Sequence, residues 1–322
     1  MGATYKHGST LSIDYTPASA TEAGTVLNRA GRVCLVQTDL EAGSVDGYAM
    51  PNVGAVAAPV GENVWEFPKA SGVVMLDGGR VYYDPASDTC SFKRGSVHAF
   101  YVGTAVGDCA STDTTVLVCV NALPRYLIDL ANSPIQTAIV KTAGAPALRR
   151  LGSAHSLELD ATNEAQKVDA LSYDSFDPRD GFIAEFIVNP VTNGSAAAVD
   201  FNLGIASGTH ATDADSIAKY MFLHIDGAST NLLLQSKDGT TTVAATDTNV
   251  DLTAGTPFEV WIDGRNPADP QVYLDGVHVL PDSVFSLAAM TTAYLLAHLE
   301  KTAATATGEL HVDRATVRLA SL

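Results

Sequence analysis

Residues 64–91 read Val-Trp-Glu-Phe-Pro-Lys-Ala-Ser-Gly-Val-Val-Met-Leu-Asp-Gly-Gly-Arg-Val-Tyr-Tyr-Asp-Pro-Ala-Ser-Asp-Thr-Cys-Ser, and they predict a strand, a turn and a second strand. Trp65 and Phe67 alternate with their neighbours at the two-residue period of a half-buried strand. Pro68 ends this ladder because it lacks a backbone donor. The sequence Asp-Gly-Gly at 77–79 tolerates positive φ, so the chain reverses there before β-branched and aromatic residues resume.

A glycine placed two residues before a valine recurs seven times before residue 100. Glycine suits a tight turn and valine suits the strand that follows it. The glycines of these units are Gly24, Gly31, Gly43, Gly54, Gly72, Gly79 and Gly95. Many short strands joined by tight turns predict an all-β barrel or sandwich, and the irregular spacing argues against a solenoid.

The 322 residues suggest about two domains, and their charge is unevenly distributed. Residues 1–121 carry a net charge of −5, residues 122–155 carry +3 and residues 156–322 carry −15. A segment as acidic as the last one repels phosphate, which disfavours nucleic-acid binding. Hydrophobic residues make up 46% of the chain and charged residues 17%, which suits a β-rich protein with a modest solvated area, or one whose surface is partly covered by partners.

The four cysteines, at positions 34, 90, 109 and 119, show neither Cys-x-x-Cys nor zinc-binding spacing. We therefore expect no metal, no cofactor and synthesis in a reducing host cytoplasm. The N-terminus lacks the apolar run of a secretion signal, and the longest apolar runs are far too short to span a membrane. No membrane partner is expected.

Short pieces of residues 4–121 follow one another in an order that resembles a known family. They are Gly8-Ser-Thr-Leu-Ser-Ile-Asp-Tyr15, Ala23-Gly-Thr-Val26, Val33-Cys-Leu-Val36, Val53-Gly-Ala-Val56, Phe67-Pro-Lys-Ala70 and Gly79-Arg-Val-Tyr-Tyr-Asp84. The family is that of bacteriophage head decoration, or capsid cement, proteins. The resemblance implies a small β-barrel or β-tulip-like domain that binds the major capsid protein on the outer surface of the virion, as a homotrimer near a three-fold axis. No Gly-x-x-x-x-Gly-Lys-Ser/Thr phosphate loop is present, so the recombinase label that such proteins sometimes carry has no support.

The resemblance is best around the strand that begins at residue 64. From it we expect Tyr5, Trp65, Phe67 and Lys69 to lie at or near the capsid or trimer interface. The strands expected in residues 1–121 are 11–15, 25–27, 33–37, 53–58, 64–67, 81–84, 99–106 and 115–121.

Residues 122–155 differ in character, and we expect a linker with a short helical connector. Pro124 suits the start of a helix over 125–130, and Pro134 stops it. The pair Arg149-Arg150 adds positive charge to this segment. A solvated connector and a docking arm for an acidic partner both remain open.

Residues 156–322 predict a second all-β domain. Val199, Phe201, Leu203 and Ile205 alternate with polar residues and glycine, which is typical of a strand buried on one face. Further strands are expected at 157–159, 182–188, 220–225, 232–235, 258–263 and 310–319. Residues 272–277 are expected to form a hairpin with its turn at Asp-Gly 275–276. Helical turns are expected at 213–219 and 283–289.

The order of these pieces resembles a concanavalin-like jelly roll, a β-sandwich. The matching pieces are His155-Ser-Leu-Glu-Leu-Asp160, Gly181-Phe-Ile-Ala-Glu-Phe186, Phe201-Asn-Leu-Gly-Ile-Ala206, Phe258-Glu-Val-Trp-Ile-Asp263, Val272-Tyr-Leu-Asp-Gly276 and Gly308-Glu-Leu-His-Val-Asp313. Such sandwiches include lectins, glycan-cleaving enzymes and plain spacers, so the fold implies no function by itself.

No residue pattern supports catalysis or metal binding. The eight histidines form no His-x-His or His-x-x-x-His pair, and His224 and His311 are expected to face solvent or a groove. Glu185, Glu259 and Asp263 are on predicted strands, where acids on the wet face are commoner than a catalytic pair. The aspartates at 174, 177 and 180, and those at 213 and 215, are expected to shape turns rather than bind calcium.

These observations favour a non-enzymatic capsid decoration protein with an outward-projecting sandwich. The alternative is a glycan-binding head fibre or adhesin, for which Trp261 is the candidate contact to a host-surface glycan, because its parity is opposite to that of Val260 and Ile262. A polysaccharide-cleaving enzyme is the third hypothesis.

Overall fold

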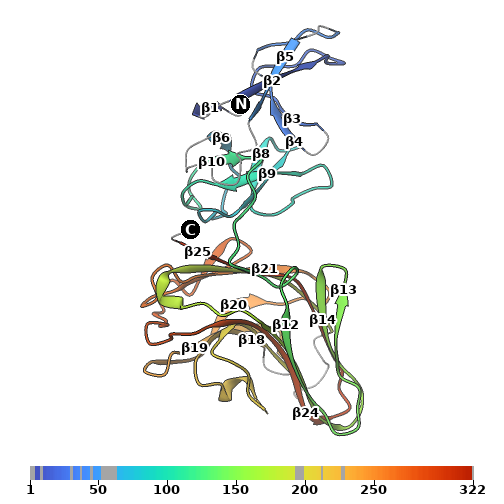
Figure 1. Ribbon diagram of the computed structural model, residues 1–322, viewed down its shortest axis with the longest axis vertical. Coiled ribbons are helices and arrows are strands. Elements are labelled where there is room, and N and C mark those ends of the chain that lie inside the picture. Colours follow the sequence, from blue (N-terminus) through green and yellow to red (C-terminus); the bar gives the residue numbers. More distant parts are fainter. Residues whose placement is uncertain are drawn as a thin grey trace. The chain divides into compact units, whose positions relative to one another are not determined.

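The computed structural model describes residues 4–7, 10–29, 32–36, 38–43, 46–51, 64–192, 199–211, 213–225 and 229–320 (Figure 1). The chain divides into two compact units, Met1–Arg125 and Tyr126–Leu322. Both units consist of antiparallel sheets, which confirms the all-β prediction. The strand expected at 53–58 lies outside the described residues. In the described part of the chain, no helix has the length and apolar character needed to cross a membrane.

The first unit contains a six-stranded and a four-stranded sheet. The six-stranded sheet has the order β1-β6-β10-β9-β7-β8, and the four-stranded sheet has the order β2-β5-β4-β3. Their strands are β1 (Thr4–His7), β2 (Thr10–Tyr15), β3 (Val26–Arg29), β4 (Arg32–Leu35), β5 (Asp46–Pro51), β6 (Val64–Pro68), β7 (Arg80–Asp84), β8 (Thr89–Ser91), β9 (Phe100–Ala105) and β10 (Thr115–Val120).

The stretch at 64–91 forms the strands that its sequence predicts. β6 ends at Pro68, and Gly78 adopts φ 71° in the turn before β7. Phe67 and Val81 are fully buried, and Phe67 packs edge-on against Tyr83 with ring centroids 6.3 Å apart. The alternation of this segment therefore builds the core of the six-stranded sheet.

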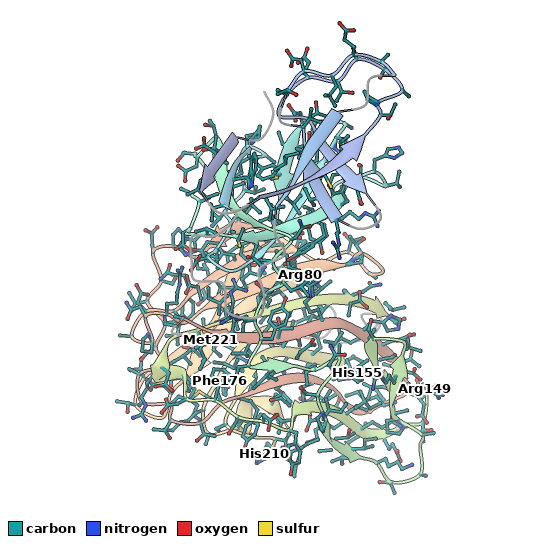
Figure 2. The ribbon with its side chains drawn as sticks, turned by 45° about the horizontal axis from the view of Figure 1, so that its top comes forward. Arg80, Arg149, His155, Phe176, His210 and Met221 are labelled. Carbon is teal, nitrogen blue, oxygen red and sulfur yellow. The ribbon has the colours of Figure 1, made fainter. Side chains whose placement is uncertain are left out.

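The second unit is the predicted two-sheet sandwich, whose layers face each other in Figure 1, and Figure 2 shows the side chains that the ribbon carries. One sheet has the order β13-β14-β25-β16-β21-β22-β23, with β11 also paired to β25, and the other has the order β12-β15-β24-β17-β18-β19-β20. The elements are β11 (Ile128–Asp129), β12 (Ile135–Val140), β13 (Ala147–Leu151), β14 (Ala154–Leu159), β15 (Glu164–Ser172), η1 (Pro178–Asp180), β16 (Phe182–Thr192), β17 (Val199–Ala206), η2 (Ala214–Ser216), β18 (Tyr220–Ile225), β19 (Asn231–Lys237), β20 (Thr242–Asp251), β21 (Phe258–Asp263), β22 (Gln271–Leu274), β23 (Val277–Val279), β24 (Tyr294–Ala304) and β25 (Gly308–Leu319).

Alternating apolar residues from both sheets form one continuous core. β17 contributes the four residues that its sequence pattern predicts, from Val199 to Ile205, and β24 contributes Leu295, Ala297 and Leu299. Intervening residues point to the opposite face of each sheet. Asp275 and Gly276 have φ of 48° and 77° and make the predicted tight turn between β22 and β23.

The expected helical connector at 122–155 is wrong. Residues 128–129 form β11, which pairs with β25, while β12 and β13 pair with β15 and β14. Ile128 and Leu130 have 1% and 2% exposure, so the observed strand pairing buries both side chains in the core. A helix of six residues is too short to be stable unless tertiary packing supports it, so the buried strand is the more stable state. Most of this segment therefore belongs to the second unit.

The two helical turns expected in the second unit have different outcomes. Residues 214–216 form a short 3-10 turn, η2, capped by Asp213, whose carboxylate accepts from the Asp215 amide at 2.7 Å. Residues 283–289 contain turns but no helix. Phe285 and Leu287 are buried there, and the Leu287 amide donates to the backbone oxygen of Pro267, a contact outside the segment that a local helix would not make.

Candidate functional site

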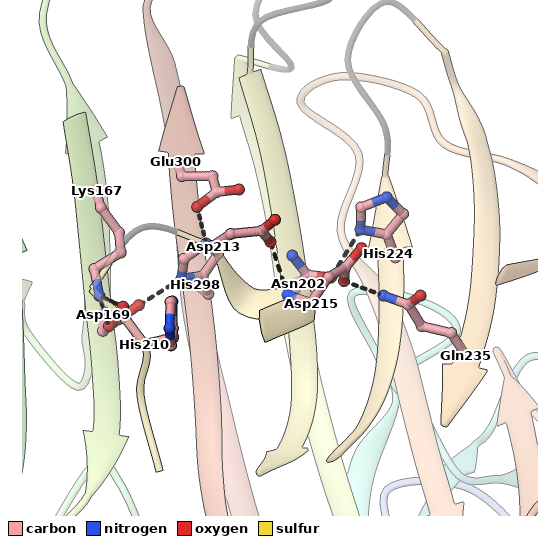
Figure 3. Close-up of polar contacts among 10 residues, drawn as sticks. All are labelled: Lys167, Asp169, Asn202, His210, Asp213, Asp215, His224, Gln235, His298 and Glu300. Atoms are coloured by element: carbon pink, nitrogen blue, oxygen red, sulfur yellow. Dashed lines mark hydrogen bonds and ion pairs between the residues drawn. The ribbon is translucent and has the colours of Figure 1, made fainter. Parts of the chain in front are cut away.

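The outer face of the β12–β20 sheet carries a row of polar side chains across four strands (Figure 3). Asp169 on β15 is opposite His298 on β24, which is opposite Asn202 on β17, which is opposite His224 on β18. These side chains alternate with core residues, so they point away from the sandwich interior. The first three nevertheless have 1% exposure and His224 has 9%, which is unusual for the outer face of a sandwich.

The connection between β17 and β18 contributes to this burial. Ala214 and Ile217 pack with Leu171, Phe222 and Leu296 in a small apolar cluster separate from the main core. These three residues occupy the outer face of β15, β18 and β24, next to the polar row. A segment that folds back over the sheet therefore encloses part of its outer face.

Four charged residues form the densest part of the row. Lys167 Nζ lies 2.8 Å from Asp169 Oδ2, and His298 Nδ1 lies 2.5 Å from Asp169 Oδ1. His298 Nε2 contacts Glu300 Oε2 at 2.9 Å. Burial by itself lowers the pKa of His298, but the hydrogen bonds and charges of Asp169 and Glu300 outweigh it and raise the pKa to about 9. With His298 protonated, two positive and two negative groups cancel, so the buried quartet is neutral at pH 7.

Further hydrogen bonds link the row to the β17–β18 connection. Lys167 Nζ donates to the backbone oxygen of His210, and Gln235 Nε2 donates to Asp215 Oδ1 at 2.6 Å. His224 Nδ1 and Asn202 Oδ1 are 2.7 Å apart. The bonds from Lys167 and Gln235 thus attach both described parts of the β17–β18 connection, 207–211 and 213–219, to the sheet.

The geometry of the quartet suits structure rather than catalysis. A general acid or base needs one nitrogen or oxygen within reach of a substrate proton. Nδ1 of His298 is hydrogen-bonded to Asp169, its Nε2 lies 2.9 Å from Glu300 Oε2, and the residue has 1% exposure, so a substrate atom does not reach the ring. The quartet therefore holds the outer face of the sheet and its covering segment together.

Of the two histidines expected to face solvent or a groove, His311 is partly exposed, as expected, and His224 is buried. His224 is buried against Asn202. His311 is half-buried, and its Nε2 lies 2.6 Å from Glu309 Oε1. Alternation predicts which face a side chain occupies but cannot reveal a covering segment, so the solvent-facing prediction for His224 is wrong.

The three strand carboxylates are also buried, contrary to the predicted wet face. Glu185 pairs with Arg318, and Asp263 Oδ2 lies 2.6 Å from Arg265 Nη2. Burial, followed by the charge of Glu185, raises the pKa of Glu259 to about 7, although the Trp261 indole donates to Glu259 at 2.8 Å. Each carboxylate thus has a partner within its own unit.

Two of the aspartates considered for calcium, Asp177 and Asp213, act in local turns, whereas the Asp215 carboxylate accepts from Gln235 on β19. Asp177 caps η1 and forms an ion pair with Arg179 at 2.5 Å, and Asp213 caps η2. Within the described ranges, no cluster of three or more His, Cys, Asp or Glu side chains has the arrangement of a metal site. None of the four cysteines, all of them within the described residues, forms a disulfide, and three are buried.

The residues expected at the capsid or trimer interface lie in or beside the core of the first unit. Tyr5 pairs with Trp65 across β1 and β6. Trp65 has 5% exposure and Phe67 has 0%, so the Phe67 side chain itself offers no surface to another subunit, and a place for these residues at or near the interface stays a prediction. Lys69 is also buried, and its ammonium donates to the backbone oxygens of Ala70 at 3.0 Å and Val73 at 2.8 Å.

Trp261 lies on the sheet face opposite the core, as its parity predicts. Its side chain has 4% exposure, and its ring lies 6.0 Å from that of Tyr273 between centroids. Its indole N–H is committed to Glu259. In this arrangement Trp261 presents little surface for stacking on a sugar.

Residues 5–120 match the family of phage cement proteins. No curated protein matches the sequence. The family match covers the first unit and none of the sandwich strands, which is consistent with the resemblance found in the sequence.

Solved structures similar to this chain were compared as well. One, from work on endo-acting O-glycanases of the human gut microbiota, is 8% identical with a TM-score of 0.45, covering 61% of this chain and 99% of the other. A carbohydrate-binding module from Bacillus subtilis is 12% identical with a TM-score of 0.33, covering 54% and 91%. A galectin from Caenorhabditis elegans is 7% identical with a TM-score of 0.30, covering 56% and 95%. At these values the likenesses carry no argument about ligand or chemistry.

Proposed function

From the match of residues 5–120 to the phage cement proteins, we propose that this chain decorates the outside of a tailed-phage capsid and stabilises it. The first unit binds the major capsid protein and forms a homotrimer at a three-fold or quasi-three-fold position. The sandwich of the second unit projects outward from the shell. The family match is the observation that carries this proposal.

Stabilisation by such a protein requires contact area rather than reactive groups. A specific interface buries about 1,200–2,000 Å² and depends on a few well-packed apolar or aromatic side chains. Large apolar residues of the first unit that remain exposed include Val97 at 80%, Leu117 at 36% and Leu123 at 76%. These residues are better candidates for the capsid or trimer contact than the buried Phe67.

Capsid binding can be tested with heads that lack the protein. Purified full-length chain is added over a range of concentrations, the heads are sedimented, and the bound chain is quantified. We expect saturable binding and a higher temperature of capsid opening in decorated heads. A folded chain that never sediments with the heads would refute capsid binding.

The contact surface can be tested with a matched pair of variants on β10. Leu117→Ser removes an exposed apolar side chain, whereas Thr115→Ser changes little at an exposed position on the same face of the strand. If Leu117 lies in the contact, the first variant needs at least about tenfold more protein for half-saturation, corresponding to about 1.4 kcal/mol. Equal binding by both variants would exclude Leu117 from the contact.

The trimer is tested separately by sedimentation of the chain without heads. One chain has a mass of 33.6 kDa, so the trimer has three times that value. A species with the mass of one chain at all concentrations would refute the trimer in solution without affecting the test of capsid binding.

A further inference from the structure

The inward face of β24 ends in a charged residue. Leu295, Ala297 and Leu299 belong to the core of the sandwich, and Lys301 follows them at the same two-residue period. Gln166, its partner across β15, is buried as well. Lys301 has 3% exposure, so a lysine occupies a position that the alternation would give to an apolar side chain.

Three backbone carbonyl oxygens surround the Lys301 ammonium. Its Nζ donates to the oxygen of Thr162 at 2.9 Å, to that of Ala306 at 3.0 Å, and to that of Asp160. An ammonium group has three N–H donors and no acceptor, so three carbonyl oxygens satisfy it completely. Asp160 and Thr162 lie in the connection between β14 and β15, and Ala306 lies in the connection between β24 and β25. One positive charge therefore joins two loops of the sandwich.

Carboxylates add negative charge near these oxygens. Burial lowers the pKa of Lys301, and the charges of Asp160 and Glu164 counteract this effect. Hydrogen bonds fix both carboxylates, because Glu164 accepts from the Gly144 amide at 2.8 Å and Asp160 accepts from Gln166 Nε2 at 2.5 Å. Oxygen ligands and nearby negative charge are the surroundings in which proteins bind cations.

The distances indicate which kind of cation these oxygens accept. The contacts of 2.9 and 3.0 Å have the length of N–H···O hydrogen bonds. Calcium–oxygen contacts are shorter, at about 2.3–2.6 Å. The arrangement therefore fits a primary ammonium ion rather than a calcium ion.

We propose that the backbone oxygens of Asp160, Thr162 and Ala306 form a cation site whose resident cation is the Lys301 ammonium, and that this site binds a free primary ammonium ion when the lysine side chain is removed. The site recognises a positive charge with three N–H donors, and the aliphatic part of Lys301 only holds that charge in place. Because this cation is covalently attached, the two loops stay joined whatever ions the solution contains. The proposal concerns the second unit and does not depend on capsid binding.

Removal of the side chain and replacement by a free ion test the proposal in the full-length chain. Lys301→Ala deletes atoms that together correspond to n-propylammonium. Urea unfolding is followed by Trp261 fluorescence in a Trp65→Phe background, at constant ionic strength, in n-propylammonium, tetramethylammonium, sodium or calcium chloride. Tetramethylammonium carries the same charge as n-propylammonium but has no N–H donor. We expect n-propylammonium at about 0.1 M to lower the unfolding equilibrium constant of Lys301→Ala at least about fivefold relative to tetramethylammonium, in a saturable manner.

Three matched proteins show whether the ion acts at this site. The parent chain has the site occupied, Lys301→Met fills the path of the stem without a charge, and Lys141→Ala removes an exposed lysine. We expect n-propylammonium and tetramethylammonium to affect each of these three proteins equally. The proposal is overturned if the two ions act equally on Lys301→Ala, if n-propylammonium stabilises Lys301→Met or Lys141→Ala as much, or if only calcium stabilises Lys301→Ala.

Refolding provides the same decision if Lys301→Ala does not fold in sodium chloride. The variant is diluted from urea into each of the four salts, and the folded fraction is measured by circular dichroism. Recovery of folded chain in n-propylammonium but not in tetramethylammonium supports the site, because binding then accompanies folding. The same recovery in both salts, or none in either, contradicts it.

Discussion

Raising the pH from about 7 to about 9.5 is expected to lower the free energy of unfolding of the second unit by about 2.5 kcal/mol through His298. Its pKa is about 9 in the folded chain, compared with about 6.5 in an unfolded chain. Because the folded pKa is the higher one, the stabilisation is complete below about pH 6.5 and is lost as the pH rises through about 9. The full difference of about 2.5 pKa units corresponds to about 3.5 kcal/mol, most of which is still present at about pH 7.

The groups that face His298 account for its raised pKa. Asp169 on β15 and Glu300 on β24 hold the protonated ring, and Lys167 balances their charge. The other titratable side chains drawn beside the quartet are His210, Asp213 and Asp215 of the covering segment and His224 of β18 (Figure 3). Glu259, with a pKa of about 7, changes stability mainly between about pH 4.5 and pH 7, below the chosen window.

The assay is urea unfolding at the two pH values in a Trp65→Phe background. The chain has two tryptophans, so Trp261 then reports the second unit alone. The control is His298→Gln, which retains a polar side chain but does not titrate. We expect this variant to be less stable than the parent at about pH 7 and to lose much less stability on going to about pH 9.5.

The quantity to compare is the stability that the parent and His298→Gln each lose between the two pH values. If the parent and His298→Gln lose the same stability between the two pH values, other groups cause the alkaline effect. If the parent loses none, the imidazole is not held in its protonated form, and the ion-pair account of the quartet is wrong.

Three further predictions concern packing and buried polar groups. Phe67→Ala should destabilise the first unit by about 3–5 kcal/mol, seen as a large drop in its denaturation midpoint, because it leaves a cavity in a fully buried site; an effect below about 1 kcal/mol would contradict its placement in the core. Gly264→Ala should prevent stable folding of the second unit, measured by circular dichroism and yield, since the new Cβ overlaps the buried ring of Phe182; a normally folded variant would show that this contact is looser than described. Lys301→Met should lower the free energy of unfolding by about 3 kcal/mol, measured by urea unfolding, because it leaves three backbone carbonyl oxygens without their ammonium donor. The exposed control Lys141→Met should change the free energy of unfolding by less than about 0.5 kcal/mol. Equal effects of the two substitutions would contradict the carbonyl contacts of Lys301.

Sequence alternation was sufficient to predict most strands and the all-β class. β17 is the clearest case, since its apolar residues face the core as its two-residue period requires. The Asp-Gly corner at 275–276 likewise forms the predicted turn, because positive φ is a local property of those two residues. The helix at 125–130 was predicted wrongly for the opposite reason. Its strand state depends on pairing with Val317, almost 190 positions later in the sequence.

The polar row could be predicted only in part. The period of two places Asn202 and His224 on the face away from the core, and this is correct. Their burial depends on Lys167, Gln235 and a covering segment, which come together only after the sheet has formed. A pattern along one strand contains no information about what covers that strand, so the quartet around His298 had no local signal.

The interface residues show a different limit of sequence comparison. The prediction for Tyr5, Trp65, Phe67 and Lys69 depends on the family resemblance, which is best around them. A resemblance made of strand and turn pieces selects residues whose burial determines the fold, and Phe67 at 0% exposure is such a residue. A contact surface has to be made of side chains that the folded subunit leaves outside, such as Leu117 on β10. A substitution at Phe67 would therefore affect binding indirectly, by destabilising the unit, whereas a substitution at the exposed Leu117 tests the contact itself.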